Sequence, residues 1–159
     1  MATSKSDEPV FARNHKAGRD YVVLETYEAG LELKGTEIKS IRQHRCSIDD
    51  SFARIDGVEL FLYNMHVNPY PQASSFNPEP IRVRKLLMHR RQIDHLSGWV
   101  SQKRVTLVPL RIYQKHGLAK VELAVVKGKR VFEKRDRIRQ REASRQIQRA
   151  LRKYQKSSD

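Results

Sequence analysis

Several features that would assign this protein to a familiar class are missing from its 159-residue sequence. A single cysteine, Cys46, excludes an internal disulfide framework and fits a reducing compartment. No apolar run approaches the ~18 residues that a membrane-spanning helix needs. The polar residues 1–9 lack the apolar segment of a secretory signal. We therefore expect a cytoplasmic protein that is not anchored in a membrane.

The sequence also lacks the residue patterns of an enzyme site. It has no glycine-rich phosphate loop and no nucleophile elbow. Its six histidines are not spaced as metal ligands, and one cysteine does not complete a zinc site. Asp49 and Asp50 form a candidate pair for a divalent metal, but adjacent acids after Ser47 more often cap or turn the chain. We expect no catalytic activity, no cofactor and no metal.

Acidic residues are too few to balance the basic ones. The chain has 18 Asp and Glu against 32 Lys and Arg, a formal net charge of +14. Residues 127–156 alone hold thirteen cations and three acids. Such a one-sided charge indicates a polyanionic partner. Nucleic acid is favoured over a membrane surface because the segment lacks the broad apolar face of an interfacial helix. A solvated tail that only aids solubility is the alternative.

This basic tail has the period of a helix. From residue 137 a cation recurs at every fourth position, which would place these side chains along one ridge. They are Arg137, Arg141, Arg145, Arg149 and Lys153. The segment has no proline and, after Gly128, no glycine. Its apolar stripe around Ile147 and Leu151 is thin, and the cations repel one another. We expect a tail that is disordered when free and becomes helical on a polyanion.

The residues before the tail show mostly strand and hairpin patterns. The expected strands are residues 21–27, 31–33, 52–55, 58–62, 105–112 and 118–126. Asp56-Gly57 lies between two apolar runs and predicts a tight hairpin turn. His116-Gly117 predicts a second turn, before the strand at residues 118–126. Gly30 interrupts the first strand pattern and predicts a bulge or bend, as does Pro109 later in the chain.

Helices are expected in two places. One begins at Gly35-Thr36, where Thr36 is the predicted cap and Glu37 a first-turn acid favoured by the helix dipole. The other covers residues 84–100, with a break around Ser97-Gly98. A long loop is expected over residues 68–80, which contain four prolines.

Closely spaced hairpins and short helices favour a small antiparallel barrel over a parallel sheet, because regular strand–helix alternation is absent. We expect about three short peripheral helices around this barrel. The expected domains are a flexible terminus at residues 1–12, a barrel domain at 13–130 and a basic tail at 131–159.

Basic and aromatic residues in the barrel domain suggest that it, too, contacts nucleic acid. Basic residues precede the first strand and surround the second helical region. They are Arg13, His15, Lys16, Arg19, Arg82, Arg84, Lys85, His89, Arg90 and Arg91. Aromatic side chains that could stack on bases are Tyr21, Tyr27, Tyr63, Tyr70 and Phe76.

Five segments in this order resemble one family closely. They are Thr26-Tyr27-Glu28-Ala29-Gly30, residues 33–42, Arg84-Lys85-Leu86-Leu87, residues 106–110 and Lys127-Gly128-Lys129. The sequence resembles the small protein B family, the SsrA-binding proteins of bacteria, from about Asn14 to Arg145. The resemblance implies an OB-like barrel that binds the tRNA-like domain of transfer-messenger RNA. It also implies delivery, with elongation factor Tu, to stalled ribosomes for trans-translation and tagging of the nascent peptide.

The resemblance also assigns roles to residues. It assigns Asn14, Glu28 and Leu87 to the surface that binds the tRNA-like domain. The other expected contacts to this domain are Lys16, Arg19, Tyr27, Lys39, Arg84 and Lys85. The expected ribosome-binding tail, helical on the ribosome and probing the decoding centre and the empty mRNA channel, uses Lys127, Gly128, Lys129, Arg130, Phe132, Glu133, Lys134, Arg135, Arg137, Arg141 and Arg145.

Three residues depart from the family pattern. Glu133 stands where Asp is usual, Phe132 replaces a Tyr or His, and Gly18-Arg19 replaces Arg-His. Each departure changes a local contact: Phe132, for example, can stack but cannot donate a hydrogen bond. Two alternatives from other classes stay open, namely a general structured-RNA-binding or ribosome-assembly protein and a metal-dependent RNA-processing nuclease.

Overall fold

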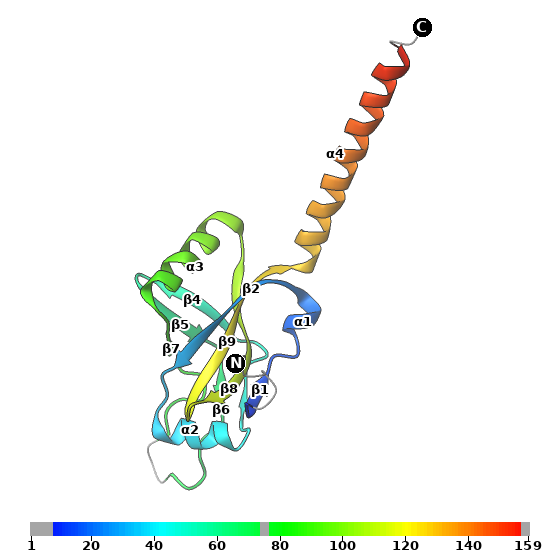
Figure 1. Cartoon of the computed structure of the whole chain (residues 1–159). Helices are drawn as coiled ribbons and strands as arrows, with labels where there is room; N and C mark the ends of the chain where they lie inside the picture. The colour runs from blue at the N-terminus through cyan, green and yellow to red at the C-terminus, as the bar shows by residue number, and fades with distance from the viewer. Residues whose placement is uncertain (1–7, 74–76, 157–159) are drawn as a thin grey trace. The chain divides into compact units, whose positions relative to one another are not determined.

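The computed structural model describes residues 8–73 and 77–156 (Figure 1). Its contacts divide the chain into two compact units, Met1–Lys127 and Gly128–Asp159. The strands of the first unit are β1 (Val10–Arg13), β2 (Tyr21–Leu31), β3 (Cys46–Ser47), β4 (Phe52–Asp56), β5 (Glu59–Tyr63), β6 (His66–Val67), β7 (Arg84–Leu87), β8 (Thr106–Lys115) and β9 (Leu118–Gly128). The helices are α1 (Ala17–Asp20), α2 (Gly35–Arg42), α3 (Arg90–Lys103) and, in the second unit, α4 (Lys129–Lys156).

Seven of the strands found within the described residues form one sheet that closes on itself. The strand order is β1-β8-β4-β5-β7-β2-β9, and an additional pairing joins β8 to β9. The ring therefore runs β8-β4-β5-β7-β2-β9 and back to β8, while β1 extends along β8. The registers of β4–β5, β5–β7, β2–β7 and β8–β9 are antiparallel. This confirms the predicted small antiparallel barrel, in which closure removes exposed sheet edges.

The barrel interior is filled by the alternate residues of its strands. In β5, Leu60 and Leu62 are fully buried, whereas the residues between and beside them are partly exposed. The same alternation places Leu86 of β7 and Leu123 of β9 in the core. Each such side chain contributes about 1.5–3 kcal/mol by leaving water. Helix α3 adds two of its own apolar residues to this core.

Three helices flank the barrel, as predicted. In Figure 1, α2 lies across one end of the barrel, α3 lies at the opposite end, and α1 lies at its side. The N-cap of α2 is Lys34, two residues before the predicted cap. The Glu37 carboxylate accepts a hydrogen bond from the backbone N–H of Lys34. Thr36 is therefore not the capping residue.

The prediction of one helix over residues 84–100 was wrong. Arg84–Leu87 is strand β7, and α3 begins only at Arg90 after His89 in an extended conformation. The apolar spacing of residues 84–87 fits a helix and a short strand equally well. These residues form a strand because they pair with β2 and β5. The predicted break at Ser97-Gly98 is also absent, because α3 continues through both residues to Lys103.

Strand β2 continues through Gly30, where a bulge or bend was predicted, and its register with β7 shows no bulge there. Gly30 pairs in regular register with Leu87 of β7, and a Cβ at Gly30 would lie 3.2 Å from the Leu87 Cβ. Close approach to β7 is therefore the reason for the glycine. The predicted irregularity at Pro109 is confirmed by a register shift between Pro109 and Arg111.

The predicted hairpins are confirmed with small shifts. Asp56 pairs with Glu59, so the two-residue turn is Gly57-Val58, one position later than expected, and Gly57 has a φ of +62°. His116 and Gly117 form the β8–β9 turn, also with positive φ. The short strands β3 and β6 were not predicted. Nor was β1, so Val10–Ala12 of the predicted flexible terminus belong to the sheet.

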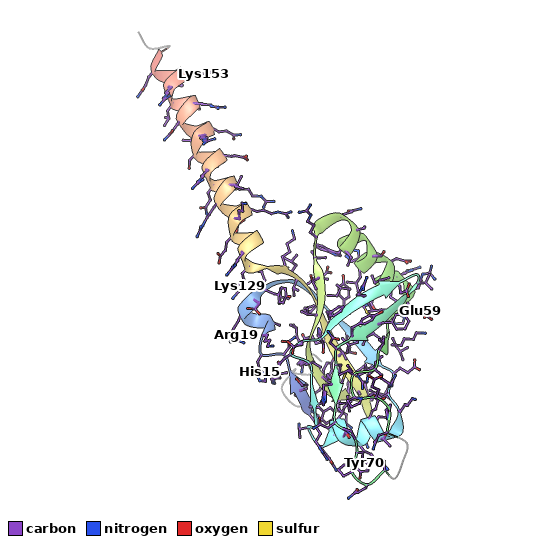
Figure 2. All side chains as sticks on the ribbon, turned by 180° about the vertical axis from the view of Figure 1, so that it is seen from behind. His15, Arg19, Glu59, Tyr70, Lys129 and Lys153 are labelled. Atoms are coloured by element: carbon purple, nitrogen blue, oxygen red, sulfur yellow. The ribbon has the colours of Figure 1, made fainter. Side chains whose placement is uncertain are left out.

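The second unit contains the helix α4, in the segment for which the sequence predicts a helix on a polyanion. The unit boundary after Lys127 lies three residues before the predicted one at 130. Ile147 and Leu151 are 62% and 59% exposed. Figure 2 shows side chains projecting around the helix from Lys129 to Lys153. Disorder of the tail in the free protein stays a prediction.

Candidate nucleic-acid interface

Asn14 organises the corner between β1 and α1. Its side-chain Nδ2 donates to the Pro109 carbonyl at 2.9 Å, and its Oδ1 accepts from the backbone N–H groups of Lys16 and Ala17. The Asn14 amide is thus engaged within the protein, where it fixes the conformation of the segment that carries His15, Lys16 and Arg19. Figure 2 shows His15 and Arg19 on this segment.

Asp49 and Asp50 bind this corner. Asp49 accepts from the His15 backbone N–H at 2.9 Å, and Asp50 accepts from Lys16 Nζ at 2.6 Å. This hydrogen bond raises the pKa of Lys16, which therefore stays protonated. Among the described residues, no group of three His, Cys, Asp or Glu side chains could hold a metal ion. Asp49 and Asp50 lie in a turn, as the alternative interpretation of this pair predicted, and both accept hydrogen bonds from the His15–Lys16 segment.

Glu28 is the centre of a polar network that spans β2, β9 and β8. The buried Tyr113 hydroxyl donates to Glu28 Oε2, and Lys115 Nζ lies 3.1 Å from the same oxygen. The Tyr113 hydrogen bond and the Lys115 and Lys120 charges together hold the pKa of Glu28 below its usual range, despite partial burial. Glu28 is therefore ionised at neutral pH and ties at least one cation to this face.

The network continues along β8 and β9. Arg111 Nε donates to Glu122 Oε2 at 2.7 Å, and its guanidinium lies 4.3 Å from the centre of the Tyr113 ring. The registers Arg111–Glu122 and Tyr113–Lys120 place these residues side by side on one face of the hairpin. The sequence analysis did not single out Tyr113, Lys115 or Lys120. The sequence indicates only that alternate residues of the strand after Pro109, such as Tyr113 and Lys115, point to the same face.

Leu87 lies on the same face of the sheet as Glu28. Gly30 and Leu87 are cross-strand partners, and Glu28 precedes Gly30 by two residues, so all three are on one side of the β2–β7 pair. The Leu87 side chain is 50% exposed. The structure thus brings together two residues that are distant in the sequence and were both assigned to the RNA face.

Tyr27 and Arg84 do not belong to that face. The Tyr27 ring packs against the core with its hydroxyl buried, and burial raises the pKa of Tyr27 to about 12. Alternation along β2 explains this, since Tyr27 points to the opposite side from Glu28. Arg84 has no exposed surface, so a phosphate contact by its guanidinium is excluded in this conformation. Tyr27 is partly exposed, and base stacking on its ring stays a prediction.

Arg84 instead forms a buried ion cluster with Glu37. Arg84 Nε donates to Glu37 Oε2 at 2.6 Å, and its Nη1 donates to the Met65 carbonyl at 2.8 Å. Arg82 donates to the other Glu37 oxygen. Burial opposes ionisation of Glu37, but the hydrogen bonds from Arg82 and the Lys34 backbone and the Arg84 charge lower its pKa overall. Glu37 is thus much more than a first-turn acid.

The other predicted RNA-contacting residues of the barrel are exposed or, in the case of Lys85, partly exposed. Lys85 Nζ lies 2.9 Å from Glu59 Oε1, which raises the pKa of Lys85. Lys39 lies over the Tyr70 ring at 5.4 Å from its centre. Figure 2 shows Glu59 and Tyr70 in different parts of the unit. Arg19 is exposed beside α1. Phe76 lies outside the described residues.

The predicted tail residues lie at the end of β9 and along α4. Lys127 and Gly128 end β9, and the remainder fall in the first five turns of the helix. Glu133, Lys134 and Arg135 are exposed. The Phe132 side chain lies outside the described part of the chain. None of the helices in that part combines the length and apolar character of a membrane span.

The sequence matches the family model described as "SmpB protein" over residues 11–153. The chain belongs to the SmpB family. Three relatives, each named SsrA-binding protein, are similar to this chain in sequence over most of its length. The protein of Caldanaerobacter subterraneus subsp. tengcongensis is 50% identical over 155 residues, 98% of both chains. That of Geobacillus kaustophilus is 53% identical over 152 residues, 96% of this chain and 98% of the relative. That of Carboxydothermus hydrogenoformans is 54% identical over 145 residues, 91% and 97% of the two chains.

A solved SmpB structure is similar in fold. It is reported as "tmRNA-SmpB: a journey to the center of the bacterial ribosome", and the aligned chain is 48% identical in sequence. The TM-score is 0.63, and the similarity covers 74% of this chain and 82% of that one. The predicted resemblance to the family is therefore confirmed over nearly the whole sequence.

Proposed function

We propose that this chain binds the tRNA-like domain of transfer-messenger RNA and brings it to stalled ribosomes for trans-translation. The observation that carries the proposal is the face of the barrel where Glu28, Leu87, Lys115 and Lys120 meet. It combines an ionised acceptor, an exposed apolar side chain and cations, which are the groups that contact bases, riboses and phosphates in folded RNA. Family membership supports the same function.

Within this function, the corner around Lys16 and Arg19 supplies a second set of cations, held in place by Asn14 and Asp50. Such contacts add affinity and orientation without reading sequence. Arg84 and Tyr27 act indirectly: Arg84 anchors the segment that leads into β7, and Tyr27 packs beneath the strand that displays Glu28.

The helix α4 has a separate role in the proposal. Its cations are distributed along the helix. They can contact RNA phosphates whatever the RNA sequence, which suits a segment placed in an RNA-lined channel. Residues from Lys129 through Arg145 would occupy the decoding centre and the mRNA channel only when no messenger is present. Delivery in a complex with elongation factor Tu and action in the cytoplasm, where ribosomes translate, are parts of the same proposal.

The deciding experiment is recovery of the protein from its native cell followed by sequencing of the bound RNA. Strong enrichment of transfer-messenger RNA is expected. A spread over many structured RNAs would favour the alternative of a general RNA-binding or ribosome-assembly protein. Binding should also be compared at one fixed salt concentration between the tRNA-like RNA and a folded RNA of equal length, because salt alone changes such affinities greatly.

A further inference from the structure

A pocket of about 230 Å³ opens where α2, β2, β7 and the β8–β9 hairpin come together. Its apolar lining includes Leu31, Leu33, Ile38 and Ile41. Gly30 adds bare backbone to the wall. Leu87 and Leu118 also line it and are 50% and 60% exposed, so apolar surface continues from the pocket to solvent.

This pocket has few polar side chains, and those that are charged are all positive. They are supplied by Arg42 at the end of α2, Gln114 of β8 and Lys120 of β9. Among the described lining residues there is no Asp or Glu. The Gln114 amide offers both a donor and an acceptor, and the two cations offer donors only. The chemistry of the lining therefore suits an apolar group that is attached to anionic groups.

Size restricts the occupant further. Pockets for drug-sized ligands span roughly 300–1,000 Å³, so about 230 Å³ is suited to a single ring system. A nucleobase has flat apolar faces, a polar edge and flanking phosphates, which match the apolar wall, Gln114 and the two cations in turn. An aliphatic side chain of a protein would fill the wall but offer no acceptor to Arg42 or Lys120.

We propose that this pocket is a nucleobase subsite, which receives one unpaired base extruded from structured RNA, while Arg42 and Lys120 contact the phosphates on either side of it. The inference rests on the proposed function and deepens it, because Gly30 and Leu87 belong both to the pocket and to the proposed RNA face. It assigns binding roles to Arg42, Gln114 and Ile38 in addition.

The test uses the full chain and a tRNA-like RNA in which 2-aminopurine replaces unpaired nucleotides one at a time. The fluorescence of one position is expected to change on binding, since that base leaves its stack. Two variants fill the pocket from different walls: Ile38→Phe from α2 and Ala119→Leu from β9. Each is expected to abolish the fluorescence change and to weaken binding roughly tenfold, the scale of one lost base contact.

The matched control is Val58→Phe, which adds an apolar ring at an exposed turn of the β4–β5 hairpin outside this pocket. It should bind like the unmodified chain. Thermal melting identifies any variant that fails to fold, and the other filling variant then decides. The inference is overturned if no position changes its fluorescence, or if a folded filling variant binds with full affinity. If the unmodified chain does not prefer the tRNA-like RNA at all, the proposed function itself fails and the subsite with it.

Discussion

At the scale of single residues, the buried Glu37 carboxylate is expected to be the most sensitive position of the barrel. Replacing Glu37 with Gln would leave the fully buried Arg84 guanidinium without its counter-charge. Removing one partner of a buried ion pair costs about 3–5 kcal/mol. We expect a loss of that order in the free energy of unfolding, measured by urea denaturation at neutral pH. Glu59→Gln, which breaks the exposed pair with Lys85, should change it little.

The same cluster predicts a pH dependence with a definite sign. The pKa of Glu37 in the folded protein is lowered from its ordinary value of 4.5. Its contribution to stability is therefore complete above 4.5 and is lost as the pH falls below that value through the folded-state pKa. The unmodified chain should lose stability over this acidic range more steeply than Glu37→Gln. Parallel curves for the two proteins would show that Glu37 is not the titrating group.

Tyr113 is expected to act on RNA through Glu28. Tyr113→Phe removes the buried hydroxyl that donates to the Glu28 carboxylate but keeps the packed ring. Loss of a hydrogen bond to a charged group should weaken binding of the tRNA-like RNA roughly tenfold. If Tyr113 only positions Glu28, the double variant with Glu28→Gln should bind no more weakly than Glu28→Gln alone. Additive losses, measured at one salt concentration, would give Tyr113 an independent contact.

At the scale of elements, β7 separates two neighbouring cations that the sequence could not distinguish. Lys85 is partly exposed and Arg84 is buried, because alternate residues of a strand face opposite sides. Lys85→Gln should reduce the slope of log affinity against log salt by about one and leave the melting temperature unchanged. Arg84→Gln should instead lower the melting temperature. An unchanged slope for Lys85→Gln would mean that this side chain stays with Glu59 in the complex.

The elements also show which parts of the fold were accessible from the sequence. The hairpins were predicted because their turns contain glycine, at Gly57 and Gly117. Glycine adopts the positive φ of such turns without steric cost, so the signal lies in the turn sequence itself. Strand β7 was missed because its conformation depends on pairing with β2 and β5 and on Glu37, which is 47 positions away from Arg84. The short strands β3 and β6 likewise exist only through their mutual pairing.

The candidate site follows the same division. The family resemblance identified Glu28 and Leu87, and the strand register showed that they share a face. It did not identify Tyr113 or the pocket beside Gly30, since both arise where strands distant in the sequence meet. The resemblance did not show that Tyr27, which is next to Glu28 in β2, points to the other side of the strand.

At the scale of the whole molecule, the two compact units predict that binding and tagging can be separated. Removing residues 134–159 leaves the described strands and the barrel core in place. The last of these strands, β9, ends at Gly128, and the core residues all precede it. The truncated chain should therefore melt like the full-length protein. It should also keep most of its affinity for the tRNA-like RNA, with a smaller salt slope because many cations are gone.

Tagging of peptides on stalled ribosomes should nevertheless fail for the truncated chain, because the segment proposed to occupy the empty mRNA channel is missing. The double variant Lys134→Ala, Arg135→Ala should fail in the same assay while keeping nearly all of the tail's charge. Glu142→Gln, which changes charge on the same helix outside that motif, is the matched control and should tag normally. Tagging at the full-length rate by the truncated chain would reduce α4 to a charge anchor. Loss of all affinity for the tRNA-like RNA would instead make α4 the main RNA site and refute the assignment to the barrel face.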